Sequence, residues 1–223
     1  MHVYNRGARG MNIVKDKADK WRFIKSLYLL NDTYKDENWH RDTAELPLFE
    51  RPQHWPERKP LVSILAYTLM PNHFHLVLKE IEEGGIAKFM QRLGGSMTLC
   101  FNLKHKGQGS IFQGSYKSRT VGKDIYLRYL SAYVLVKNVF ELYPGGLQKA
   151  LQNFDTAWDW AMAYEFSSLG VTAGKAHSPI LDNSLILNLD LAPSKKFKSD
   201  AKDMFFGHVS IKDSLKQSIL ETW

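Results

Sequence analysis

The alternation of apolar and polar side chains predicts a chain that mixes helices and strands. Residues 2–6 form a short run typical of a strand, and the run ends at Gly7. Apolar residues recur at helical spacing over 17–30 and over 85–104, which predicts two amphipathic helices. Between these helices, two apolar runs flank residues 70–72, a pattern typical of two strands joined by a sharp turn.

The following part of the chain adds a strand and a third helix. Residues 116–121 are predicted to be extended, and a helix is expected from residue 124 to about residue 142. The order is then strand, helix, strand, strand, helix, strand, helix. This order predicts an α+β fold, a ferredoxin-like (RRM-like) antiparallel sheet with helices on one face and the other face open to a ligand.

Two segments fall outside this pattern. Residues 31–60 are polar and contain four prolines, which neither a helix nor a central strand accommodates, so we predict a surface insertion there. Beyond residue 170 the chain becomes polar, with a short final helix expected near 210–222. We therefore predict one main domain over 1–170 and an accessory C-terminal tail over 171–223.

Composition narrows the class of protein. A hydrophobic content of 44% argues for a folded chain, and the net charge of +7 favours a polyanionic partner such as nucleic acid or an acidic membrane. The single cysteine, Cys100, rules out an internal disulfide and a zinc–cysteine cluster. Because no apolar run approaches the roughly 18 residues of a membrane span, and no signal-like start is visible, we expect a cytoplasmic protein without membrane contact.

A pair of histidines is the most informative feature. On a strand, residues two apart point the same way, so His73 and His75 share one face while Phe74 points to the other. Two imidazoles on an open sheet face suit one divalent cation. Such a pair is more often simply solvated or hydrogen-bonded, but the surrounding apolar alternation and the turn just before it favour the metal site.

Several blocks of the chain, in order, resemble the single-tyrosine HUH transposases, including the REP-associated tyrosine transposases and their insertion-sequence relatives. Residues 70–77 are similar to the histidine–hydrophobe–histidine motif, and residues 2–7 to the start of that family. Residues 109–118 and 131–138 resemble the segment before the nucleophile helix and that helix itself. Residues 164–168 resemble an aromatic-Ser-Ser segment that often follows.

The resemblance spans roughly residues 1–170, with 31–60 set aside, and it implies a catalytic domain that binds single-stranded or hairpin DNA. It also implies that His73 and His75 hold Mg²⁺ or Mn²⁺ at the scissile phosphate. A tyrosine then attacks, leaving a 5′-phosphotyrosine link and a free 3′-hydroxyl that can reverse the step. The family includes monomers and homodimers, and both remain open for this chain.

The third helix offers three candidate nucleophiles, Tyr126, Tyr129 and Tyr133. On a regular helix they fall within a sector of roughly 60°, so spacing alone does not choose, and an aromatic core stripe is the alternative for at least two of them. The family pattern points to Tyr133 as the catalytic residue.

The position four residues after Tyr133 departs from the family pattern. Members of the family often have Gln, Asn or His there as a third metal ligand, whereas this chain has Lys137. A protonated lysine cannot ligate a metal, so Lys137 is a candidate phosphate contact. Asn138 is an alternative ligand if the helix is locally distorted, because in a regular helix it points about 140° away from Tyr133.

Basic residues gather around the proposed nucleophile. Residues 101–128 contain six basic side chains and one acidic side chain, a net charge of +5. Such a segment can neutralise phosphates, although a solvated basic loop is the alternative. The predicted DNA-binding residues are Arg6, Gln113, Lys117 and Arg119. Two other functions stay open: a nucleic-acid-binding module that does not cut, and a metal-dependent hydrolase that uses water.

Overall fold

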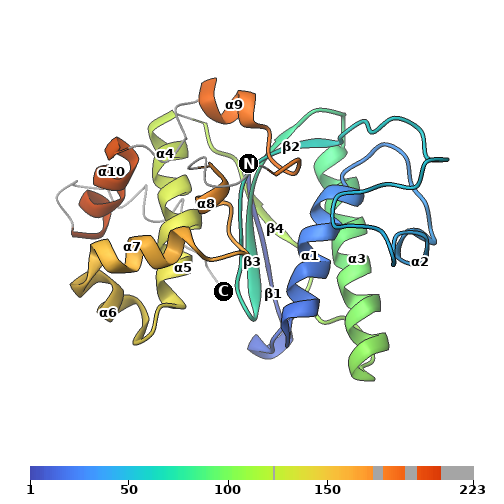
Figure 1. Cartoon of the computed structure of the whole chain (residues 1–223), viewed down its shortest axis with the longest axis horizontal. Helices are drawn as coiled ribbons and strands as arrows, with labels where there is room; N and C mark the ends of the chain where they lie inside the picture. Colours follow the sequence, from blue (N-terminus) through green and yellow to red (C-terminus); the bar gives the residue numbers. More distant parts are fainter. Residues whose placement is uncertain (123, 173–177, 189–194, 207–223) are drawn as a thin grey trace.

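The computed structural model describes residues 1–122, 124–172, 178–188 and 195–206. A four-stranded antiparallel sheet runs through the middle of these residues, with helices on both sides (Figure 1). The strands are β1 (His2–Arg6), β2 (Val62–Leu69), β3 (His73–Glu80) and β4 (Lys117–Arg119), in the spatial order β2-β3-β1-β4. This confirms the predicted α+β class and the antiparallel sheet.

The ferredoxin-like core is completed by two helices on one face of the sheet. They are α1 (Lys17–Leu29) and α3 (Gly85–His105), which begin and end within one residue of the predicted spans. Phe74 of β3 points to this side and packs against Phe23 of α1, with ring centroids 5.5 Å apart. The alternation of strand side chains therefore places the apolar residues of β3 against these two helices.

The second face of the sheet is covered, and the prediction of an open face is wrong. The helix that follows β4 lies across it as α4 (Asp124–Ala132), the π-helical turn η2 (Tyr133–Lys137) and α5 (Asn138–Glu141). Farther from the sheet than these helices lie α6 (Gly146–Gln152) and α7 (Phe154–Met162) (Figure 1). The physical reason is that this face also carries apolar residues of β2 and β3, such as Ala66 and Val77, which are buried only under this layer.

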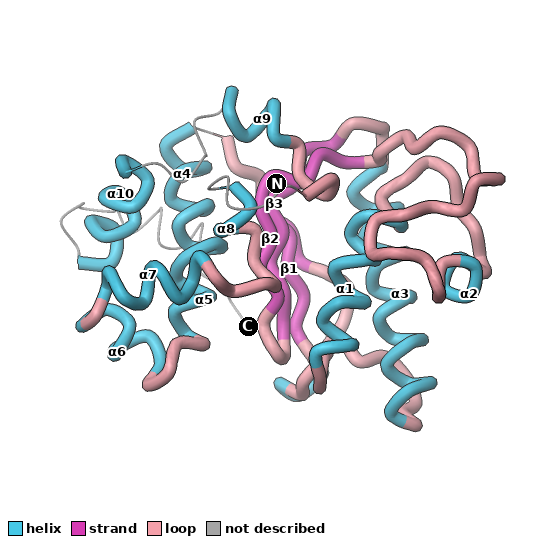
Figure 2. Tube along the Cα trace, in the orientation of Figure 1, coloured by secondary structure: helices cyan, strands magenta, loops and turns pink. Residues whose placement is uncertain are grey.

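The predicted insertion is mostly loop, as Figure 2 shows, with one short helix, α2 (Trp39–Asp42). Its two tryptophans, Trp39 and Trp55, are buried and belong to the hydrophobic core. Its ends are fastened by Asn31, whose side-chain oxygen accepts the backbone N–H groups of Leu61 and Val62. The insertion therefore packs onto the domain although it adds no strand to the sheet.

The remaining described elements are η1 (Ala8–Gly10), α8 (Leu169–Thr172), α9 (Asn183–Asn188) and α10 (Lys195–Phe206). Leu181 pairs with Ile64 of β2, and α10 packs against α4. The final helix expected near 210–222 lies outside the described residues, and the division at residue 170 stays a prediction. None of the described helices has the length and apolar character needed to cross a membrane.

Candidate functional site

The strand register gathers the predicted site residues on the face that α4, η2 and α5 cover. Tyr4 lies opposite His75 on one side and opposite Lys117 on the other. Arg6 lies opposite His73 in the same ladder. Because side chains alternate along each strand, one face receives the following set. It comprises His2, Tyr4, Arg6, His73, His75, Lys117 and Arg119.

The two predicted metal ligands lie next to each other. The rings of His73 and His75 have centroids 5.0 Å apart and are nearly perpendicular. Nδ1 of His73 donates to Oδ1 of Asn72 at 2.7 Å, and Nδ1 of His75 is 3.0 Å from Nε2 of His2. Metal-bound histidines usually engage their second nitrogen in such a hydrogen bond. Nε2 is therefore the ligating atom that each ring offers.

Sequence reasoning missed His2. Its side chain is 1% exposed, its ring stacks on His75 with centroids 5.3 Å apart, and it shares the 3.0 Å hydrogen bond. The signal in the sequence is slight: His2, like Tyr4, occupies an alternate position of the first strand. Only the pairing of β1 with β3, two strands far apart in the chain, brings it to His75.

Among the candidate nucleophiles whose side chains the structure describes, Tyr133 lies beside the histidines. Its ring centroid is 5.9 Å from that of His75 and 6.3 Å from that of His2, and its side chain is 6% exposed. Tyr129 lies on α4, which packs against α10. Burial raises the pKa of Tyr129, and the negative charges of Asp200 and Asp203 on α10 add to this shift. The side chain of Tyr126 lies outside the described residues.

The helix is locally distorted at the predicted nucleophile. In η2 the backbone N–H of Asn138 donates to the carbonyl of Tyr133, five residues earlier. A turn that holds one extra residue brings Asn138 round toward the direction of Tyr133, whereas a regular helix would turn it about 140° away. The side chain of Asn138 is wholly buried, and neither of its polar atoms has a hydrogen-bond partner among the described residues. A buried amide of this kind fits a ligand.

A hydroxyl on the sheet holds this turn in place. Thr68 of β2 lies opposite His75 in the strand ladder, and its Oγ1 donates to the carbonyl of Val134 at 2.6 Å. The bond gives the carbonyl of Val134, inside the π turn, a side-chain donor from the sheet. It also fixes η2 directly beside the histidine pair.

The site opens to solvent at the start of β3, beside His73. Here Nζ of Lys137 lies 4.9 Å from the ring centroid of Tyr133 and forms an ion pair with Glu141 at 2.6 Å. An open cavity of about 500 Å³ is lined by Arg6, His73 and Lys137 among others. Gln113 lies nearby, since its backbone N–H donates to the carbonyl of Arg6 at 2.9 Å. Its side chain is exposed.

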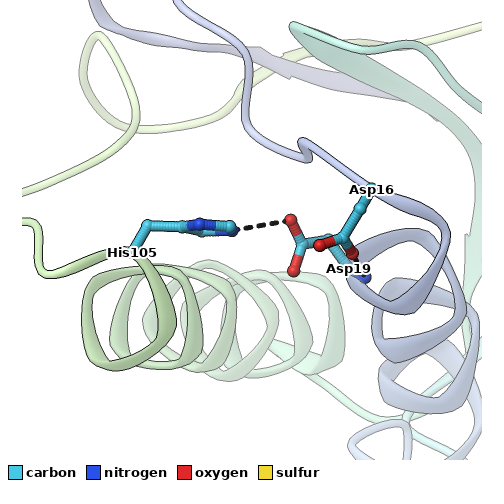
Figure 3. Close-up of side chains that lie close together, drawn as sticks. All are labelled: Asp16, Asp19 and His105. Atoms are coloured by element: carbon cyan, nitrogen blue, oxygen red, sulfur yellow. Dashed lines mark hydrogen bonds and ion pairs between the residues drawn. The ribbon is translucent and has the colours of Figure 1, made fainter.

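A second group of metal-ligating residues lies on the other side of the sheet. Figure 3 shows His105, at the end of α3, pointing toward Asp19 of α1, with Asp16 beside it. Nζ of Lys104 lies 2.6 to 2.8 Å from the carboxylates of Asp16 and Asp19, where a cation would otherwise sit. This group is therefore an ion-pair network that ties α1 to α3.

Burial by itself raises the pKa of Asp19. Hydrogen bonds from the Lys104 ammonium group, the Lys15 backbone N–H and His105 outweigh that effect, and they hold the pKa of Asp19 at about 2. The carboxylate therefore stays charged and paired with its neighbours at neutral pH. This charge is part of what fastens the two helices.

Comparison with known families gives one match. Residues 54–136 match the family model described as "Transposase IS200 like". No curated protein and no solved structure matches the chain. The matched segment contains His73, His75 and Tyr133, and it ends just before Lys137 and Asn138.

Proposed function

Residues 54–136 belong to the IS200-like transposase family, and on that premise we propose that the chain cuts and rejoins single-stranded or hairpin DNA through Tyr133. The observation that carries this proposal is the distance of 5.9 Å between the ring centroids of Tyr133 and His75, next to a cavity lined by Arg6, His73 and Lys137. This arrangement supports a nucleophile, a cation site and an entrance for phosphate that lie close to one another.

The residues present fit a divalent cation, which members of this family commonly use. His73 and His75 would hold Mg²⁺ or Mn²⁺ through Nε2, and the amide oxygen of Asn138 is our candidate for a third ligand. When bound, the cation offsets the charge of the scissile phosphate and stabilises the departing oxygen. The hydrogen bonds of His73 to Asn72 and of His75 to His2 hold both rings in a ligating orientation.

Tyr133 supplies the covalent step. Its phenol oxygen forms a bond to phosphorus while the bond to the 3′-oxygen breaks, and the phenol proton is matched by the proton gained on that 3′-oxygen. Since the unperturbed pKa of tyrosine is about 10, the phenolate needs stabilisation. Our candidate for this role is the ammonium group of Lys137, 4.9 Å from the ring centroid of Tyr133. The 5′-phosphotyrosine link keeps the bond energy, so rejoining needs no nucleotide cofactor.

DNA enters from the end of the sheet, because the helices cover its face. Arg6 and Lys137 line the entrance, and Lys117 and Arg119 extend positive charge along β4. Gln113 lies on the loop beside Arg6. A single strand bends into such an opening far more easily than a stiff duplex does, which supports unpaired DNA as the substrate.

The test is an adduct assay. The protein is incubated with end-labelled hairpin DNA and Mn²⁺, and the linked residue is identified by mass spectrometry. We expect a covalent protein–DNA adduct at Tyr133 that disappears in Tyr133→Phe. Cleaved DNA without an adduct, still produced by Tyr133→Phe, would mean a hydrolase that uses water.

The second candidate function is a DNA-binding module that does not cut. The observations that favour it are the low exposure of Tyr133, at 6%, and the ion pair that Lys137 makes with Glu141. The same assay separates the two functions, because the binding module retains labelled DNA without any covalent link. Glu141→Gln, which releases Lys137, should accelerate adduct formation only if the chain is a strand transferase.

A further inference from the structure

A cavity lies on the opposite side of the sheet from His73 and His75. It has a volume of about 780 Å³ and is bounded by α3, the end of β1 and the loop over residues 107–116. Its lining includes Asn5, Gln91, Gly95, Asn102, Phe112 and Tyr116. None of the functional residues discussed so far lines this cavity.

The chemistry of the lining suits a flat, neutral, polar ring. No residue that lines the cavity carries a charge, and its polar groups are amides and hydroxyls, which both donate and accept hydrogen bonds. Gly94 and Gly95 are adjacent, so α3 presents no bulky side chain to the cavity at these two positions. Tyr116 adds a half-buried aromatic ring. A nucleobase has this combination of planar faces and polar edges.

Two pairs of consecutive residues have one member in the cavity lining and the other on the face that carries His73 and His75. Asn5 lines it, and the next residue, Arg6, lines the entrance beside His73. Tyr116 lines it, and the next residue, Lys117, lies on the catalytic face opposite Tyr4. A DNA strand that crosses the short edge strand β4 would therefore have its phosphates near Lys117 and a base near Tyr116.

We propose that this cavity binds one unpaired base of the DNA strand that reaches the catalytic face. The inference rests on the proposed function for the identity of the substrate, and it adds a second contact point remote from the cut. Neutral amides read the base while basic residues outside the cavity hold the backbone. Such a contact strengthens and orients DNA binding without taking part in the chemistry.

Gly95 allows the cavity to be filled without disturbing the protein. A Cβ atom at Gly95 would meet no atom within 4 Å, and the residue lies in the middle of α3. Gly95 lines this cavity and also a neighbouring pocket, so Gly95→Leu narrows the cavity at that shared wall, while Gly95→Ala changes the helix in the same way and leaves the cavity open. Both variants should fold at least as well as the original chain, because glycine is a poor helix former.

Binding is measured with fluorescein-labelled single-stranded oligonucleotides, including a series in which each member lacks one base. We expect Gly95→Leu to raise the dissociation constant about tenfold, the loss of roughly one stacked base, and Gly95→Ala to leave it unchanged. In the original chain one abasic position should weaken binding, and in Gly95→Leu the same position should have no further effect. Adduct formation at saturating DNA should be equal in both variants.

Three results would overturn the inference: equal affinity of Gly95→Leu and Gly95→Ala, no sensitive abasic position, or a loss of dimers in Gly95→Leu that shows a second copy of the chain occupying the cavity. Failure of the proposed function looks different. In that case the original chain forms no adduct, while the dependence of DNA binding on residue 95 and on one base persists.

Discussion

Strand β3 borders two regions of different character. On the α1–α3 side Phe74 is wholly buried among aromatic and aliphatic side chains. On the other side His75 is equally buried but lies among polar rings, including those of His2 and Tyr133. The first region gains stability from apolar burial, whereas the second holds polar groups that tolerate burial only while they are hydrogen-bonded. The apolar cluster around Phe74 and the polar cluster around His75 thus lie on opposite faces of the sheet, although the second face also buries apolar residues such as Val77.

The difference between the two regions is tested most strongly by replacing the side chains of two consecutive residues of β3, Phe74 and His75, with alanine. Phe74→Ala should lower the free energy of unfolding by about 3–5 kcal/mol, because it removes a ring that packs against Phe23 and Phe112. His75→Ala should cost clearly less stability and should abolish Mn²⁺ binding. Urea unfolding and titration calorimetry measure the two effects. Equal destabilisation by both variants would contradict the separation.

The role of His2 on the polar side is tested through metal affinity. His2→Phe keeps a buried ring but loses the hydrogen bond to Nδ1 of His75, so the affinity for Mn²⁺ should fall about 10- to 100-fold. His2→Gln retains a donor and an acceptor and should restore part of the affinity. If both variants bind Mn²⁺ like the original chain in calorimetry, His2 only fills space.

The ion pairs between α1 and α3 sharpen the comparison from the other side. Asp19→Asn should destabilise the chain at neutral pH by about 1–2 kcal/mol, since it removes a carboxylate paired with Lys104 and His105. The pKa of Asp19 is lowered to about 2 in the folded chain, so its contribution is present above the unfolded value of about 4 and is lost as the pH falls toward 2.

The measurement is urea unfolding of the original chain and of Asp19→Asn across that pH range. The difference between them should shrink as the pH falls. Because the network lies on the side of the sheet away from the histidines, Mn²⁺ affinity at neutral pH should be the same in both. A change in metal affinity would mean that the two sides are coupled.

The smallest expected effect concerns the bond that holds the π turn. Thr68→Val leaves the carbonyl of Val134 without its hydroxyl donor and should cost about 1 kcal/mol of stability. Adduct formation should slow several-fold as Tyr133 loses its fixed position. Thr43→Val is the matched control, because the buried hydroxyl of Thr43 makes the same kind of bond to Trp39 far from the site. Equal adduct rates in the two variants would show that Thr68 is merely structural.

Local patterns predicted the features that depend on nearby residues. The helix expected over 85–104 spans Gly85–His105, and alternation placed His73 and His75 together because the period of a strand is independent of its neighbours. The part played by His2 was not predictable, since it depends on the register between strands more than 70 residues apart. Pairing of that kind leaves little trace in a short window of sequence.

The π turn and the covered face were missed for a related reason. Residues 133–137 have the composition of an ordinary apolar helix, and that composition does not predict an extra residue in the turn. Its partner, Thr68, comes from a strand that precedes the turn by more than 60 residues. The helical layer likewise covers the sheet because of tertiary packing, which periodicity in single elements does not reveal.

The extra residue in η2 determines the direction in which the side chains of the following helix, α5, point around the helix axis. Val139 and Phe140, both wholly buried, face the core only because the preceding turn is one residue longer than usual. Deleting a residue from that turn would rotate both by about 100° and would carry Asn138 with them. Interior packing and the angular position of the amide are therefore tied to one insertion, so a change that shortens the turn alters both at once.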